Sequence, residues 1–231
     1  MALRGLIFDF DGLIVDTETA ITLAWEEVHA EDGRTADRAV LHSVVGHEGV
    51  AVDLWQAYPL EQDRAGLEAR FQKLARKRCE EAPVLPGVVE LMEAAKAAGL
   101  RLAVASNSSH RHVDGHLKAR GLWARFDVVV CRDDVARGKP APDPYLLALE
   151  KLGLAAEDVV AFEDSVPGHE AAAAAGLRVV VVPNPVTGRD VFPQAVWRAG
   201  SMADVSLAEL ERLGAKKPAG EGRRAGELAG R

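Results

Sequence analysis

The stretch Leu6-Ile7-Phe8-Asp9-Phe10-Asp11-Gly12 decides the fold of this chain. Its apolar run shows little polar alternation and stops at two carboxylates separated by one residue. Such a short run is typical of a strand buried on both faces, the kind found in parallel sheets. In those sheets, ligands bind beyond the carboxyl ends of the strands. We therefore expect Asp9 and Asp11 to lie where chemistry takes place. The alternative is that they only form a turn, as Asp commonly does.

The composition indicates a globular protein without affinity for polyanions. Its 231 residues have room for one large α/β domain or for a domain with an insertion. A hydrophobic fraction of 48% suffices for a core. The net charge of −7 argues against a nucleic-acid partner or an anionic membrane, because either would require a basic face. No apolar run approaches the roughly 18 residues of a membrane span.

Compartment and assembly are predicted from equally simple features. Aspartates interrupt the apolar N-terminal segment, so we do not expect a signal peptide. Cys79 and Cys131 are the only cysteines, too few for a disulfide framework and without metal-ligand spacing. We predict a reduced, cytoplasmic protein that is a monomer or a weak dimer.

Residues 17–84 lack the β-branched runs of the rest of the chain. Apolar residues recur there at helical spacing, for example at Ile21, Trp25 and Val28. We interpret the stretch as a helical insertion in which Trp25, Trp55 and Phe71 form a core rather than a substrate platform. The tail lacks apolar periodicity and is expected to be mobile. The predicted divisions are residues 1–16 (first part of the core domain), 17–84 (insertion), 85–214 (second part of the core domain) and 215–231 (tail).

After residue 85 the sequence alternates between helix and strand patterns. We expect helices at residues 88–98, 110–120, 145–152 and 171–175. We expect strands at residues 102–105, 127–131, 159–162 and 179–182. Asp143 is predicted to cap the third of these helices, with Pro144 as its first residue. This alternation predicts a Rossmann-like α/β fold, a parallel sheet with helices on both faces.

Polar side chains gather after the strands of the predicted sheet. They are Asp9 and Asp11, Ser106 and Asn107, Lys139 on a proline-braced loop, and Glu163 with Asp164. Because parallel strands end at one edge, we expect these side chains to converge. Four carboxylates in a small volume require a cation, and hard oxygen ligands suit Mg²⁺. A lysine and a serine beside such a cation would complement a phosphate, which one carboxylate could attack while another donates a proton.

These motifs resemble, in order, the four motifs of the haloacid dehalogenase superfamily. They are Asp9-Phe10-Asp11-Gly12, Ser106, Lys139-Pro140 and Glu163-Asp164-Ser165. Each follows a predicted strand, and the match extends over nearly the whole core. The insertion after Asp16-Thr17-Glu18 resembles the superfamily's helical cap, placed as in its phosphatase and β-phosphoglucomutase-like branch. Each motif alone is weak, whereas the ordered set is specific.

The resemblance implies roles for the residues that act on the phosphate. Asp9 would be the nucleophile that forms an aspartyl-phosphate. Asp11 would be the general acid and base. Ser106 and Lys139 would hold the phosphoryl oxygens, with Asn107 as an additional phosphate contact. The implied substrate is a small, phosphorylated, sugar-phosphate-like metabolite.

The resemblance also implies a magnesium site. Asp164 would complete this site, with Glu163 as a ligand directly or through water. Asp9 would contribute a carboxylate oxygen and Asp11 its backbone carbonyl.

The residues at particular positions distinguish phosphate hydrolysis from the other activities of the superfamily. Dehalogenases of the superfamily lack an acid two residues after the nucleophile, so Asp11 argues against dehalogenation. β-Phosphoglucomutases carry a cap histidine, a cap arginine and a lysine where this chain has Ile21, Gly49 and Ser109. These departures favour hydrolysis over mutase activity, which stays the alternative. A non-catalytic phosphate-binding protein is a further alternative, and the retention of every motif residue argues against it.

Two further clusters are given structural interpretations. His110, His112 and His116 recur at helical spacing, and we expect them on a solvated helix face rather than around a metal. The charge run Arg76-Lys77-Arg78 is likewise expected on a solvated face rather than at the substrate.

Overall fold

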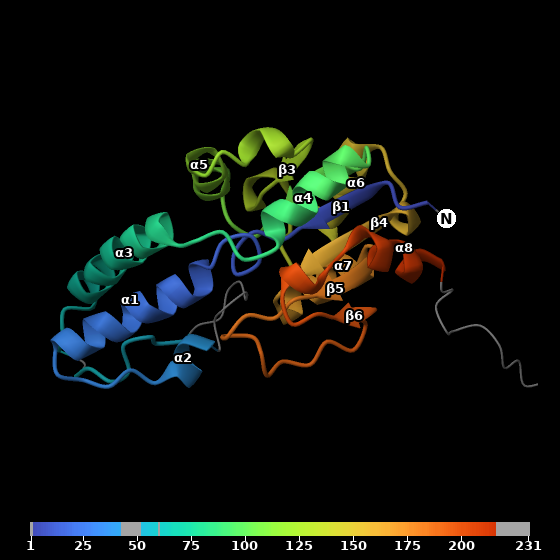
Figure 1. Cartoon of the computed structure of the whole chain (residues 1–231). Coiled ribbons are helices and arrows are strands. Elements are labelled where there is room, and N and C mark those ends of the chain that lie inside the picture. The colour runs from blue at the N-terminus through green and yellow to red at the C-terminus, as the bar shows by residue number, and fades with distance from the viewer. Residues whose placement is uncertain (1, 43–51, 60, 216–231) are drawn as a thin grey trace, which may run out of the picture.

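The computed structural model describes residues 2–42, 52–59 and 61–215, and its centre is a six-stranded parallel sheet (Figure 1). The strands are β1 (Gly5–Phe8), β2 (Arg101–Ala105), β3 (Val128–Val130), β4 (Val159–Glu163), β5 (Arg178–Val181) and β6 (Trp197–Arg198). Their spatial order is β3-β2-β1-β4-β5-β6, so the first strand lies inside the sheet. Phe8 pairs with Val104 on one side and with Phe162 on the other. The ends of β1, β2 and β4 therefore meet at one edge.

Helices cover both faces of this sheet, as the sequence predicts. They are α4 (Val88–Ala97), α5 (His110–Ala119), α6 (Asp143–Leu152), α7 (Val166–Ala174) and α8 (Leu207–Ala215). Successive strand side chains point to opposite faces. Leu6 and Phe8 pack with residues of α4, α5 and α8, whereas Ile7 packs with residues of α6 and α7. Short 3-10 helices span Trp123–Arg125, Arg132–Asp134, Ala156–Asp158 and Met202–Asp204.

A helical segment extends away from the sheet (Figure 1). It consists of α1 (Thr17–Glu31), α2 (Arg38–His42) and α3 (Arg64–Glu81). Helices α1 and α3 pack together around an apolar cluster of their own, which contains Trp25, Trp55 and Phe71. These side chains are only 1%, 5% and 6% exposed, so the prediction that they form a core is confirmed.

The two connections between the helical segment and the sheet run beside each other. Val15 and Val84 form an antiparallel bridge. Asp16 is the N-cap of α1, and its carboxylate accepts a hydrogen bond from the backbone N–H of Thr19 at 3.3 Å. This pairing fixes the start of α1 relative to β1 and places Thr17 and Glu18 next to the strand end.

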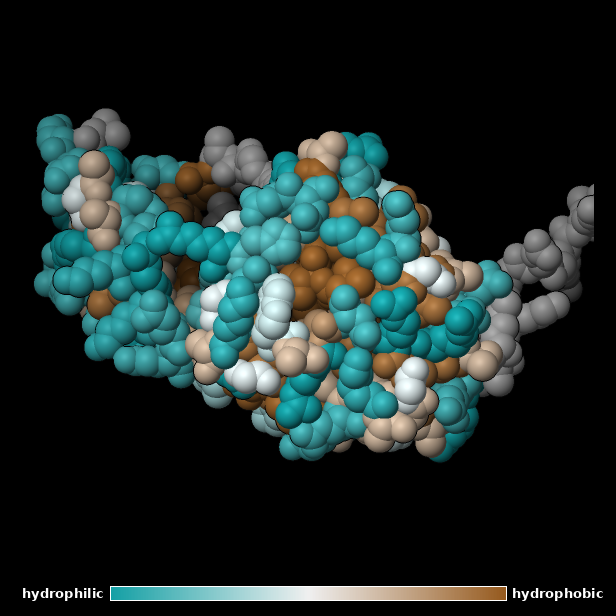
Figure 2. Space-filling view, turned by 90° about the horizontal axis from the view of Figure 1, so that it is seen from above, coloured by the Kyte–Doolittle hydropathy of each residue, from teal (hydrophilic) through white to brown (hydrophobic). Residues whose placement is uncertain are grey.

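A cleft of about 820 Å³ lies between the helical segment and α5. It is lined by residues of α1 and α3 on one side and of α5 on the other. Figure 2 shows hydrophilic residues over most of the face seen from above, with hydrophobic residues visible in the recess between the helical segment and the sheet. Within the described residues, no helix is long and apolar enough to cross a membrane.

Several element boundaries differ from the sequence prediction. Asp143 is not the N-cap of α6; the helix already includes it, and its carboxylate binds Arg137 at 2.8 Å instead. Helix α7 begins at Val166, earlier than predicted, because the Ser165 hydroxyl caps it. Strand β6 is not predicted from the sequence, because a strand of two residues has no readable periodicity. Helix α8 is not predicted either. Helix α8 extends to Ala215, and residues 216–231 of the predicted tail lie outside the described residues.

Gly168 in α7 leaves the space that the carboxyl group of Glu163 fills. A Cβ at position 168 would lie 2.1 Å from that group. Glu163 is 0% exposed, and its carboxyl group is held by hydrogen bonds from Lys139 and Tyr145. We expect Gly168→Ala to lower the free energy of unfolding by about 1–3 kcal/mol in urea denaturation, because the core would be overpacked.

Gly115→Ala in α5 is the matched control, because a Cβ there meets nothing within 4 Å. It should leave the free energy of unfolding unchanged or raise it by about 0.5–1 kcal/mol. Equal stability of the two variants would contradict the packing argument.

Candidate active site

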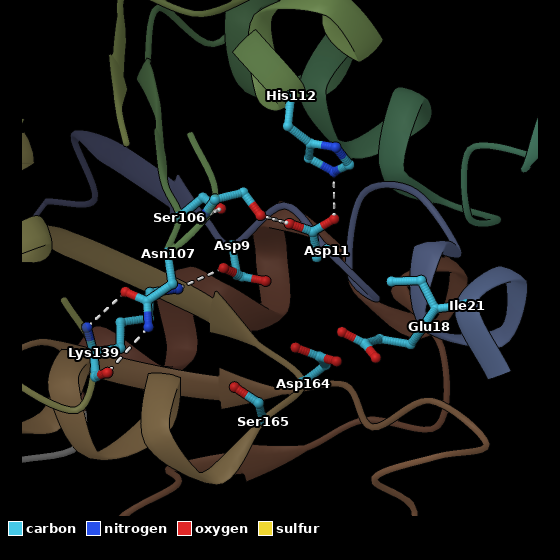
Figure 3. A pocket seen from close by; sticks show the side chains of 11 residues that line it. Asp9, Asp11, Glu18, Ile21, Ser106, Asn107, His112, Lys139, Asp164 and Ser165 are labelled. Carbon is cyan, nitrogen blue, oxygen red and sulfur yellow. Dashed lines mark hydrogen bonds and ion pairs between the residues drawn. The ribbon is translucent and has the colours of Figure 1, made fainter. Parts of the chain in front are cut away.

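A cavity of about 300 Å³ opens at the carboxyl ends of β1, β2 and β4 (Figure 3). Its wall comprises Asp9, Asp11, Glu18, Ile21, Ser106, Asn107, Ser108, His112, Lys139, Asp164 and Ser165. All the predicted site residues except Glu163 are therefore on this wall. Glu163 lies directly behind it, fully buried and in contact with Lys139.

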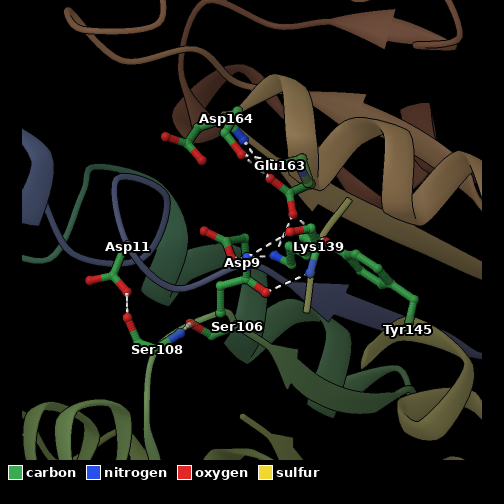
Figure 4. A network of polar contacts seen from close by, with 11 residues as sticks. Asp9, Asp11, Ser106, Ser108, Lys139, Tyr145, Glu163 and Asp164 are labelled. Carbon is green, nitrogen blue, oxygen red and sulfur yellow. Dashed lines mark hydrogen bonds and ion pairs between the residues drawn. The ribbon is translucent and has the colours of Figure 1, made fainter. Parts of the chain in front are cut away.

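The buried ammonium group of Lys139 joins two carboxylates (Figure 4). Its Nζ lies 2.5 Å from Oδ1 of Asp9 and 2.5 Å from Oε1 of Glu163. Burial alone would lower the pKa of Lys139, but the charges of Asp9 and Glu163 outweigh burial and hold this pKa above its ordinary value. The Tyr145 hydroxyl donates to the same oxygen of Glu163, and the Tyr145 ring centre lies 5.1 Å from Nζ. The lysine is therefore charged and directed at Asp9.

Asn107 holds the loop that carries Lys139. Its Oδ1 accepts the backbone N–H of Lys139 at 2.6 Å, and its Nδ2 donates to the backbone carbonyl of Lys139 at 3.0 Å. The side-chain amide predicted to contact phosphate is thus engaged at both ends, and a phosphate contact by Asn107 stays a prediction. Ser106 lies on the cavity wall, and its hydroxyl oxygen accepts the Ser108 N–H at 3.0 Å. The Ser106 hydroxyl proton is left for another acceptor.

Three buried carboxylates form the acidic part of the site. Oxygens of Asp9, Glu163 and Asp164 lie within 4.8 Å of one another. Burial raises the pKa of Asp9 to about 7 despite the nearby Lys139. Burial, together with Asp9 and Glu163, raises the pKa of Asp164 well above its usual range. Asn184 donates to Asp164 at 2.6 Å and orients it. This all-oxygen donor set fits a hard divalent cation such as Mg²⁺ better than a soft metal.

Asp11 lies in a different environment on the other side of the cavity. Its Oδ1 accepts hydrogen bonds from Thr17 Oγ1 and His112 Nε2, each at 2.8 Å, and its Oδ2 accepts one from Ser108 Oγ at 2.6 Å. Burial alone would raise the pKa of Asp11, but these hydrogen bonds outweigh burial and hold the pKa below its ordinary value. Asp9 and Asp11 thus have pKa values that their different surroundings displace in opposite directions.

The prediction that His112 lies on a solvated helix face is wrong. Its side chain is 31% exposed, lines the cavity and contacts Asp11. Burial alone would lower the pKa of His112, but the hydrogen bond and charge of Asp11 outweigh burial and raise it. His116, one turn further along α5, has a pKa lowered to about 4 by burial and by His112. The sequence signal that could have identified His112 is its position in the first turn of the helix that follows the end of β2.

Glu18 is a cavity residue that the sequence analysis did not single out. Figure 3 shows its carboxylate directed toward that of Asp164. Burial, followed by the charges of Asp11 and Asp9, raises the pKa of Glu18 to about 8. Within the described part of the chain its carboxylate has no hydrogen-bond or ion-pair partner, whereas its backbone carbonyl accepts the Thr22 hydroxyl at 2.9 Å. The sequence signal that could have identified Glu18 is its place directly after Asp16-Thr17, a few residues beyond the first motif.

The arrangement of strand ends and carboxylates defines a class of protein. The family model for haloacid dehalogenase-like hydrolases matches residues 6–182. The chain belongs to the haloacid dehalogenase-like hydrolase family. It is a phosphatase, as its relatives also indicate.

Particular relatives resemble it along nearly the whole chain. The phosphorylated carbohydrates phosphatase of Thermotoga maritima is 32% identical over 214 residues, which are 90% of this chain and 96% of that protein. Protein CbbY of Rhodobacter capsulatus is 37% identical over 226 residues, which are 92% of this chain and 98% of that protein. The crystal structure of CbbY from Rhodobacter sphaeroides in complex with xylulose-(1,5)bisphosphate has a TM-score of 0.74 and 31% identity, covering 90% of this chain and 99% of that one.

The raised pKa of Glu18 predicts a pH-dependent cost to stability. Its ordinary value of 4.5 applies to the unfolded chain, and its folded value is about 8. Between these values the folded protein binds more protons than the unfolded chain, so stability falls as pH rises. In metal-free protein at pH 8–9 we expect Glu18→Gln to raise the free energy of unfolding by about 1–2 kcal/mol. The gain should disappear below about pH 4.5, where the carboxyl group is protonated in both states.

The measurement is urea denaturation of both proteins in EDTA across this pH range. Glu150→Gln serves as the control, because Glu150 is exposed on α6. A stability difference between Glu18→Gln and the wild type that does not change with pH would contradict the argument.

Proposed function

We propose that this protein is a Mg²⁺-dependent phosphatase that hydrolyses a small, sugar-phosphate-like monoester through an aspartyl-phosphate on Asp9. The observation that carries the proposal is the Asp9 carboxylate, which lies on the cavity wall and is bound by the buried Lys139 of the same wall. A nucleophilic carboxylate needs a fixed position and a neighbouring positive charge to receive an anionic phosphate, and this pair supplies both.

In the first step an oxygen of Asp9 attacks phosphorus and the bond to the ester oxygen breaks. The hydrogen bonds to Asp11 favour its carboxylate, so this step proceeds from the fraction of enzyme in which Asp11 is protonated. In that form Asp11 gives its proton to the departing oxygen, which leaves as an alcohol. Lys139 and Ser106 hold the phosphoryl oxygens by an ammonium and a hydroxyl donor. The products of this step are the aspartyl-phosphate and an Asp11 carboxylate.

In the second step water attacks the phosphorus of the aspartyl-phosphate. The Asp11 carboxylate takes a proton from that water, and the Asp9–phosphorus bond breaks. Inorganic phosphate is released, Asp9 is again a carboxylate, and Asp11 is protonated for the next turnover. Thr17, Ser108 and His112 hold Asp11 on the side of the cavity where both transfers take place.

Asp9 and Asp164 are the residues we assign to the magnesium ion, together with the Asp11 backbone carbonyl. We assign Glu163 to the same site through water, because both of its oxygens already accept hydrogen bonds from protein groups. When bound, the ion would offset the negative charge of the carboxylates and of the phosphate.

The substrate class is inferred from the relatives and from the second cleft. One relative is named for phosphorylated carbohydrates, and another binds a sugar bisphosphate in its crystal structure. The cleft of about 820 Å³ shares Ile21 and His112 with the catalytic cavity, and so gives room for a sugar beside the phosphate. We assign residues 17–84 as a cap over this cleft. We also place the enzyme in the cytoplasm as a monomer or weak dimer.

Hydrolysis is favoured over the mutase alternative. Ile21, an apolar side chain, lies on the wall where the mutases carry a cap histidine. Ser109, where they carry a lysine, is exposed at the start of α5. Gly49 lies outside the described residues.

Asp9→Asn should lower kcat at least about 10³-fold, because the amide is a poor nucleophile and the loss of a covalent catalyst is large. The assay is phosphate release from a panel of sugar phosphates, with a hydroxylamine-labile acyl phosphate on the wild-type protein sought by mass spectrometry. β-Glucose 1-phosphate with a bisphosphate primer should release phosphate and give little glucose 6-phosphate. Rapid turnover by a folded Asp9→Asn variant would overturn the nucleophile assignment.

Removal of divalent metal should abolish turnover, and Mg²⁺ should restore it, because Lys139 alone does not balance the carboxylates. Asp164→Asn should raise the Mg²⁺ concentration for half-maximal activity by about tenfold or more. The measurement is a Mg²⁺ titration of enzyme treated with EDTA, followed by phosphate release. Unchanged activity after exhaustive metal removal would contradict the proposed cofactor.

A further inference from the structure

The acid and base of the proposed reaction has a partner on helix α5. We propose that His112 is a positioning residue that holds Asp11 in place for proton transfer to the leaving group and from water. The inference rests on the proposed function, in which Asp11 performs both transfers. It adds a residue of this chain that none of the sequence motifs contains.

The contact between His112 and Asp11 is close and occurs at the cavity surface. Nε2 of His112 lies 2.8 Å from Oδ1 of Asp11, and both side chains line the cavity (Figure 3). The same oxygen accepts the Thr17 hydroxyl, and the other oxygen accepts the Ser108 hydroxyl. With donors on both oxygens, the carboxylate cannot rotate without breaking at least one hydrogen bond.

The donors to Asp11 belong to different parts of the fold. Thr17 is the first residue of α1 and so belongs to the helical segment. His112 and Ser108 belong to α5 and to the loop that precedes it. The Val15–Val84 bridge fixes Thr17 beside the end of β1. Donors from three separate segments thus hold the Asp11 carboxylate.

The His112 ring is itself fixed by packing. Its edge meets the ring of Phe10 at 5.7 Å and 88°. It meets the ring of His116 at 4.5 Å and 61°. Phe10 is fully buried between the two aspartates of the first motif. The imidazole is thus held against the residue that separates Asp9 from Asp11, which gives its nitrogen a defined direction.

A positioning role predicts a dependence on the leaving group. A good leaving group needs little help from a general acid, whereas a poor one needs the full proton transfer. Phenyl phosphate and p-nitrophenyl phosphate have the same ring, but p-nitrophenol leaves far more readily. The kcat/KM for each ester reports the step in which that group leaves.

His112→Phe keeps an aromatic ring against Phe10 and removes the donor. We expect kcat/KM for phenyl phosphate to fall about 10- to 100-fold, while that for p-nitrophenyl phosphate falls less than about threefold. His112→Gln, whose amide can donate to Asp11, should recover a large part of the loss. His110→Asn is the control on the same helix, because His110 bonds Asp114 and Asp134 rather than Asp11. It should leave both values within about twofold, as expected for a site independent of Asp11.

The double variant separates positioning from direct substrate binding. In an Asp11→Asn background, His112→Phe should cause no further loss if it acts through Asp11. An additional loss of tenfold or more there, or equal losses for both esters in the single variant, would overturn the proposal. If Asp11→Asn itself spares phenyl phosphate hydrolysis, the proposed function fails. If Asp11→Asn is impaired and His112→Phe behaves as wild type, only the role of His112 fails.

Discussion

A buried ammonium group between two carboxylates is the constraint on which the rest of the site depends. Removing charges from water costs several kcal/mol for each ion, and the attraction between them offsets this cost only when geometry and further hydrogen bonds are good. Lys139 meets this condition through contacts with both Asp9 and Glu163. The surrounding sequence serves the same contacts. Tyr145 donates to Glu163, and Gly168 leaves room for its carboxyl group. Tyr145 in α6 and Gly168 in α7 do not line the cavity, yet both accommodate the carboxyl group that binds Lys139.

Much of the fold could be predicted because its signals are local. The apolar strands and the helices between them have distinct periodicities, and parallel strands must end at one edge. Asp9, Ser106, Lys139 and Asp164 reach the same cavity for this reason. The direction of a side chain is not local. Asn107 has a residue type suited to phosphate, yet both ends of its amide hold the Lys139 backbone. No pattern in the sequence states whether an amide faces a ligand or a loop that lies more than thirty residues away.

His112 and Glu18 show a second limit of the sequence. Each lies in the first turn of a helix, where a polar residue is ordinary and carries no periodic signal. What gives these side chains a role is the direction in which α5 and α1 leave the strand ends. The stripe of α5 buried against the sheet includes Val113 and Leu117. His112 lies beside that stripe on the side of the cavity, whereas the sequence alone leaves both sides of the stripe equivalent. Asp143 failed as a predicted cap for a related reason, since Arg137 on the preceding loop binds it.

The two aspartates of the first motif are neighbours in sequence but are governed by different surroundings. Asp9 is buried among carboxylates, so its ionised form depends on Lys139 and on any further cation in the cavity. Asp11 is surrounded by hydroxyl and imidazole donors, so its ionised form is stabilised by neutral dipoles and by His112. The fully buried Phe10 separates the two residues in the sequence, and both of their side chains line the same cavity. A motif with one apolar residue between two acids can therefore hold two carboxyl groups in different electrostatic surroundings within one cavity.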